Sequence, residues 1–187
     1  MSHGQSHHGY SVLLREIESL RVESGVTGIA LVLLGLKGMR EVNGTLGYVA
    51  GDRMLEVIAG RMGDIRREQD RLVRISGVLF ALLIRNPLHE GHVVLGAEQA
   101  VRVATDPVVI GDERTRLRAQ AGIALLPGSA MTAEDLIRQC ELAIDEAGRR
   151  DERYVVYTPA INPEKGPDRE VWSDIDDALR QGEFEIH

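Results

Sequence analysis

The feature that most constrains the fold is an unbroken run of apolar residues and glycines, GIALVLLGL, at positions 28–36. A strand with one solvated face would alternate polar and apolar residues, and this run does not alternate. Continuous apolar strands of this kind are buried on both faces. The run therefore predicts a central strand in a sheet that is covered by helices on both sides.

The rest of the chain supplies elements to surround that strand. Apolar residues at helical spacing predict helices over residues 11–23, 87–104 and 132–148, and a helix that begins at Asp52. Residues 38–42 start a short helix that breaks at NGTLG. Further strands are predicted over residues 71–75, 78–84, 107–110, 116–126 and 153–159. The tight Ser76–Gly77 turn makes a hairpin, so we expect an α/β (α+β) fold with a mixed central sheet flanked by helices.

Composition excludes several functional classes. Hydrophobic residues make up 43% of the chain, enough for a core, and the net charge of −7 disfavours binding to nucleic acid or to an anionic membrane. No apolar run is long enough to cross a membrane. Cys140 is the only cysteine, which excludes an internal disulfide and predicts a cytoplasmic protein. Its place on an apolar helix face predicts a buried, unreactive thiol.

The chain divides into four parts by composition. Residues 1–10 are polar and rich in histidine, and we interpret them as a disordered lead or tag. Residues 11–159 hold the elements described above, and residues 160–168 form a linker that contains proline and glycine. Residues 169–187 predict an amphipathic helix followed by the start of a strand, as at the beginning of a further domain that has been cut short.

The stretch NGTLGYVAGD, which follows the first strand, carries a family signature. Asn43, Gly47, Gly51 and Asp52 match the pattern N-x-x-x-G-x-x-x-G-D, and AGIALLPGS and AEDLIRQCELAIDEA match the second half of the same family. The chain thus resembles the GGDEF domain, whose diguanylate cyclases condense two GTP molecules into cyclic di-GMP on a nucleotidyl-cyclase palm-like fold. The end of the chain, DIDDALRQGEFEIH, resembles the opening of an EAL phosphodiesterase domain, which implies a GGDEF–EAL tandem protein.

The residues expected to perform the cyclase reaction are missing. By the resemblance, metal-binding aspartates belong at Gly35 and Lys37, and the acids of the signature turn belong at Val78 and Leu79. Mg²⁺ requires carboxylate oxygens, and a lysine pointing inward would repel it. We therefore expect no cofactor, no tightly bound Mg²⁺, no catalytic residues and no cyclase activity. A weakly active diguanylate cyclase is the alternative.

Some ligand-binding positions survive. The resemblance assigns Asn43 and Asp52 to guanine and Arg40 to phosphate, which would make the domain a GTP-binding allosteric module. The purely structural alternative is that Asn43 begins a turn and Asp52 caps a helix. The lysine that the family uses on phosphates falls at Gly148, and a nearby tyrosine falls at Asp145.

The R-x-x-D motif Arg67–Asp70 has the spacing of the family's inhibitory site for cyclic di-GMP. A second arginine of that site falls near Gln99, with Arg102 close by. Arginine can form two parallel hydrogen bonds to guanine or to phosphate. The structural alternative is that the motif is only a solvated helix end with an arginine near the helix C-terminus. His89 and His92 lack a third ligand, so no metal site is predicted. The expected partners are cyclic di-GMP or GTP, an attached EAL domain that the module controls, and a second copy of the chain in a homodimer.

Overall fold

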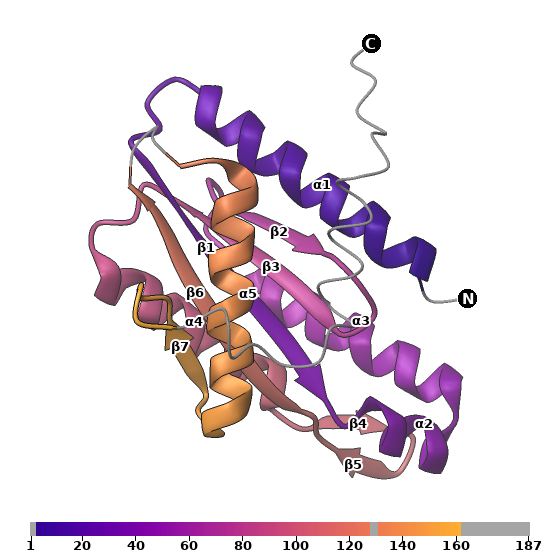
Figure 1. The fold of residues 1–187 in the computed structure, drawn as a ribbon. Coiled ribbons are helices and arrows are strands. Elements are labelled where there is room, and N and C mark those ends of the chain that lie inside the picture. The colour runs from indigo at the N-terminus through magenta and orange to yellow at the C-terminus, as the bar shows by residue number, and fades with distance from the viewer. Residues whose placement is uncertain (1–2, 128–130, 162–187) are drawn as a thin grey trace.

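A computed structural model describes residues 3–127 and 131–161 (Figure 1). The helices are α1 (His3–Val22), α2 (Met39–Leu46), α3 (Tyr48–Ile65), α4 (Glu90–Thr105) and α5 (Ala133–Arg150). The strands are β1 (Gly28–Lys37), β2 (Arg71–Arg74), β3 (Leu79–Arg85), β4 (Val108–Ile110), β5 (Glu113–Thr115), β6 (Arg118–Pro127) and β7 (Tyr154–Val156).

In the described residues the main sheet has five strands in the order β2-β3-β1-β6-β7. Neighbouring strands are antiparallel except β6 and β7, which are parallel. Strands β4 and β5 form a separate two-stranded ribbon next to α2 and α3 (Figure 1). This is the mixed sheet flanked by helices that the sequence predicts.

The central strand β1 is buried on both faces, as expected. Ala30, Val32 and Leu34 lie in one hydrophobic core with residues of α3 and α4. Leu31 and Leu33 lie in a second core with residues of α1 and α5. Residues that alternate along one strand thus contribute to both cores, and this explains why its sequence is apolar throughout.

The helices after β1 correct the predicted boundaries. Asn43 lies inside α2 rather than in a turn, and Asp52 lies inside α3 rather than capping it. The break comes at Gly47, which adopts φ 85° and donates its N–H to the carbonyl of Asn43 at 3.1 Å. Glycine adopts this conformation at little cost, so one residue suffices to end α2 and begin α3.

The amino-terminal prediction also changes. The sequence predicts a disordered lead over residues 1–10, but α1 already begins at His3. Gly9 and Tyr10 are buried, and a Cβ at Gly9 would overlap the backbone of Ile75. Close packing of the helix against the segment that follows β2 therefore orders this region.

Two further expectations concern connections. The predicted polar turn GDERT contains β5, which pairs with β4 and leaves only Gly111 and Asp112 between the two strands. The capping box of Thr132 and Asp135 at the start of α5 is confirmed, with Thr132 Oγ1 accepting the Asp135 N–H at 3.1 Å. Most of the predicted linker 160–168 and the whole of 169–187 lie outside the described residues.

Candidate functional site

The sheet brings the expected catalytic positions together where β1 ends. Gly35 pairs with Leu79 of β3 on one side and with Gln120 of β6 on the other. The next residue, Leu36, donates its N–H to the carbonyl of Val78 at 2.8 Å. The site expected for the metal is therefore formed by a glycine, the apolar side chain of Leu79 and the partly exposed Val78.

These residues do not fit a magnesium ion. Mg²⁺ prefers carboxylate and phosphate oxygens in octahedral geometry, and Gly35, Val78 and Leu79 offer no side-chain oxygen. Within residues 3–127 and 131–161, no group of three or more His, Cys, Asp or Glu side chains could hold a metal ion. The backbone carbonyl of Val78 already accepts a hydrogen bond from the N–H of Leu36.

Lys37 at the end of β1 turns toward α5. A Cβ added to Gly148 would lie 3.5 Å from Lys37 Nζ and 3.6 Å from Gln120 Oε1, so both atoms stand over that glycine. Burial raises the pKa of Asp145, one turn earlier in α5, while the charges of Arg149 and Lys37 oppose that rise. The resemblance expects a lysine at position 148. In this chain that position is a glycine, and the ammonium group of Lys37 lies beside it.

The two guanine-binding candidates lie close together. Asn43 on α2 packs its side chain against Gly51 on α3, where a Cβ would overlap Asn43 Oδ1. This close contact explains the glycine. Asn43 Oδ1 is buried without a hydrogen-bond partner. Asp52, which follows Gly51 in α3, is exposed. Both groups are acceptors, the type that the donor edge of guanine requires. The phosphate candidate Arg40 is exposed on α2.

Arg67 and Asp70 are bonded to each other. Arg67 Nε donates to Asp70 Oδ2 and Arg67 Nη2 to Asp70 Oδ1, each at 2.8 Å. This hydrogen bond raises the pKa of Arg67. Asp70 Oδ1 also accepts the N–H of Arg85 on β3 at 3.0 Å, and Arg67 Nη2 donates to the Arg85 carbonyl at 3.0 Å.

The pair therefore ties the segment after α3 to β3. The Asp70 side chain is only 5% exposed and the Arg67 side chain 35% exposed, so the acid is inaccessible while the arginine covers it. The third expected member, Arg102, is exposed on α4, as is Gln99. The contacts of the pair run to Arg85 and not to Arg102.

A buried polar pair that the sequence interpretation did not identify links α1 to α5. Tyr10 Oη donates to Glu141 Oε1 at 2.6 Å, and Glu141 Oε2 is buried without a partner. Burial is the main reason that the pKa of Glu141 rises to about 8 and that the pKa of Tyr10 also rises. One signal was available, because Glu141 follows Ile137 by four residues and so shares the apolar face of its helix.

The thiol next to this pair is confirmed as buried. Cys140 is fully buried, and its Sγ lies within hydrogen-bonding distance of two carbonyl oxygens, that of Leu31 at 3.2 Å and that of Gly122 at 3.0 Å. Burial raises the pKa of this thiol, which disfavours the reactive thiolate.

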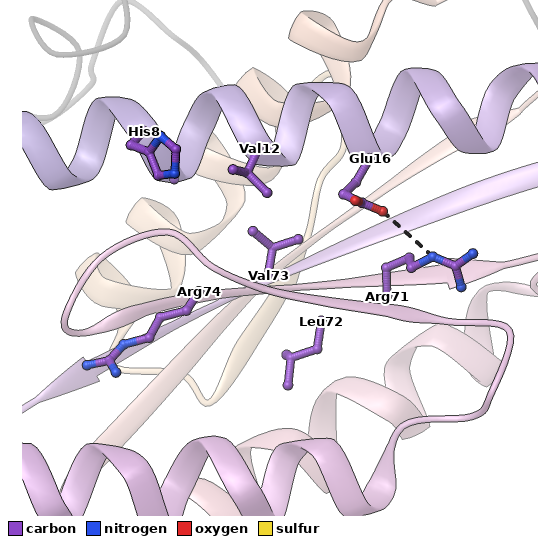
Figure 2. A pocket seen from close by; sticks show the side chains of 8 residues that line it. His8, Val12, Glu16, Arg71, Leu72, Val73 and Arg74 are labelled. Carbon is purple, nitrogen blue, oxygen red and sulfur yellow. Dashed lines mark ion pairs between the residues drawn. The ribbon is translucent and has the colours of Figure 1, made fainter.

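A cavity of about 390 Å³ lies between α1 and the edge strand β2. In Figure 2, Val73 points toward α1 whereas Leu72 points to the opposite side of the strand. Glu16 of α1 and Arg71 of β2 form an ion pair at 3.6 Å across it. The residues that line the cavity do not include the candidate nucleotide-binding residues.

Comparison with known proteins decides the family. Residues 13–153 match the family described as "Diguanylate cyclase, GGDEF domain". The chain belongs to the GGDEF family. Two curated relatives of this GGDEF domain come from Pseudomonas aeruginosa. The cyclic di-GMP phosphodiesterase NbdA is 22% identical over 94% of the chain, and the bifunctional diguanylate cyclase/cyclic di-GMP phosphodiesterase MucR is 29% identical over 84%. The chain spans only 22% and 23% of their respective lengths.

Solved structures agree with this assignment. An EAL/GGDEF domain protein from M. capsulatus shares 25% identity and a TM-score of 0.66, over 77% of this chain and 94% of that one. The GGDEF domain of TpbB (YfiN) from Pseudomonas aeruginosa shares 26% identity and a TM-score of 0.65, over 83% of this chain and 88% of that one. Among the described residues of the GGDEF domain, no helix is both long and apolar enough to cross a membrane.

Proposed function

We propose that this GGDEF domain does not synthesise cyclic di-GMP and acts as a regulatory module of a larger cyclic di-GMP signalling protein. The observation that carries the proposal is the end of β1, where Gly35, Val78 and Leu79 meet without a carboxylate. Activation of a 3′-hydroxyl for attack on an α-phosphate needs a metal held by hard oxygen ligands. Lys37 adds a positive charge where that ion would have to bind.

The relatives suggest what the module regulates. NbdA is named a cyclic di-GMP phosphodiesterase and MucR a bifunctional enzyme, and this chain corresponds to under a quarter of each. Because residues 169–187 resemble the opening of an EAL domain, we take an attached EAL phosphodiesterase domain as the regulated partner. A cytoplasmic location and a homodimer complete this proposal.

Two ligands are candidates for the regulatory signal. Cyclic di-GMP would bind at Arg67 and Asp70 with Arg102, but only after the internal Arg67–Asp70 pair opens, which lowers the expected affinity. GTP would bind at Asn43 and Asp52. The exposed carboxylate of Asp52 favours GTP, since it can accept hydrogen bonds from guanine without an internal pair having to open first.

The first experiment tests for synthesis. The purified domain is incubated with GTP and Mg²⁺, an active diguanylate cyclase serves as positive control, and the products are separated by chromatography. We expect no cyclic di-GMP. Accumulation of cyclic di-GMP above that in an enzyme-free reaction would refute the proposal.

The second experiment tests the two ligands by calorimetry. We expect GTP binding that weakens in Asp52→Ala and is unchanged in the matched control Arg53→Ala, because both side chains are exposed on α3. For cyclic di-GMP, the informative variant is Arg102→Ala, since Arg102 is exposed and its loss should leave the fold intact. If neither Asp52→Ala nor Arg102→Ala changes the affinity for GTP or cyclic di-GMP, both sites are excluded.

A further inference from the structure

Two basic residues face each other where β1 ends and β6 begins. Lys37 and Arg118 are direct partners in the antiparallel register, and both are exposed. Residues directly opposite each other project from the same face of the sheet, with Cβ atoms about 4.5–5.5 Å apart. Like charges in that arrangement destabilise a sheet unless an anion lies between them.

The fold supplies little negative charge to offset this pair. Within residues 3–127 and 131–161, no carboxylate forms an ion pair with Lys37 or Arg118. Asp145 faces Lys37 from α5, but as a single carboxylate it offsets at most one of the two cations. The end of β1 therefore carries net positive charge.

Gln120, on the same face of β6 as Arg118, bonds to the backbone at and just after the end of α5. Its Nε2 donates to the carbonyls of Ala147 and Glu152, each at 3.1 Å. Gln120 Oε1 is buried without a partner and stands, like Lys37 Nζ, over Gly148. The missing side chain at Gly148 therefore leaves space beside both atoms.

We propose that Lys37 and Arg118 form a phosphate-binding edge that takes the triphosphate of a nucleotide without a divalent cation. Lysine binds a phosphate oxygen as a point charge, and arginine binds two oxygens through its fork. The two side chains supply the positive charge that a metal supplies where carboxylates are present. This inference rests on the proposed GTP binding for the guanine contacts but not for the phosphate contacts.

The test uses two probes, inorganic tripolyphosphate and GTP, each titrated calorimetrically in EDTA and again in excess Mg²⁺. We expect both probes to bind in EDTA and Mg²⁺ to give no gain in affinity. Lys37→Met and Arg118→Met should each weaken tripolyphosphate binding about tenfold, the order of one charge-assisted contact. The control Arg138→Met changes an exposed arginine near the other end of α5 and should have no effect. Thermal melts confirm that each variant is folded.

The outcomes separate this inference from the proposed function. Tripolyphosphate binding that is absent in EDTA, that requires Mg²⁺, or that survives both substitutions overturns the phosphate-binding edge. If tripolyphosphate binds as expected but GTP binds no more tightly, the edge stands and the guanine site fails. GTP binding that depends on Asp52 but not on Lys37 or Arg118 supports the guanine site and overturns the edge.

Discussion

Replacing Arg67 with alanine tests whether the R-x-x-D motif serves the fold. Asp70 would lose both hydrogen bonds from the guanidinium and keep only the N–H of Arg85. Its carboxylate would remain 5% exposed at first, next to β3, without a compensating charge. The variant should therefore be destabilised even in the absence of any ligand.

The magnitude follows from the burial of the two partners. Removing one partner of a buried ion pair costs about 3–5 kcal/mol. The Arg67 side chain is 35% exposed, so water can reach Asp70 once the arginine is gone, and we reduce the figure to about 2–3 kcal/mol. For a domain of this size, that loss lowers the melting temperature by roughly 5–10 °C.

The measurement is thermal unfolding followed by circular dichroism, with Arg53→Ala as the control because Arg53 is exposed on the neighbouring helix. The double variant Arg67→Ala/Asp70→Ala should lose less than the sum of the single variants, since no unpaired charge stays behind. If the melting temperature of Arg67→Ala lies within about 1 °C of the control, the pair has no structural role. The motif would then be free to act as a ligand site.

Four other substitutions test the packing. Burial raises the pKa of Glu141 from 4.5 to about 8. Between these pH values the folded state holds one more proton than the unfolded state, so the free energy of unfolding falls as the pH rises. Glu141→Gln should flatten this pH dependence in thermal melts from pH 5 to 8. Tyr10→Phe removes the hydrogen bond to Glu141 and should cost about 1 kcal/mol in urea unfolding, and no change would argue against that bond. Gly122→Ala places a Cβ on the carbonyl of Cys140 and should abolish soluble folded protein, whereas Gly60→Ala in α3 meets open space and should add about 0.5–1 kcal/mol.

The sheet could be predicted from the sequence because its pattern is local. The run at 28–36 has no alternation, so it requires two covered faces, and the cores on either side of β1 supply them. The start of α3 could not be predicted in the same way. Asp52 is a good capping residue, but Gly47 sits earlier and adopts a backbone conformation that ends α2 and fixes the boundary.

The candidate site was only partly predictable, because its decisive contacts join distant segments. The positions of Gly35, Val78 and Leu79 followed from the family signature, and the register brings them together. The state of Arg67 and Asp70 depends on Arg85, whose backbone reaches them only once β3 has paired. A motif of four residues carries no information about that third group.

The central position of β1 sets the order in which the chain can fold. Its β3 side can be covered by a nearby hairpin, but its β6 side pairs Gly28 with Pro127 and Lys37 with Arg118, far along the chain. Closing so long a loop delays this pairing, and folds dominated by such distant contacts form slowly. Until β6 has been synthesised, β1 exposes an apolar edge to other chains, and so a nascent fragment that stops short of β6 is prone to aggregate.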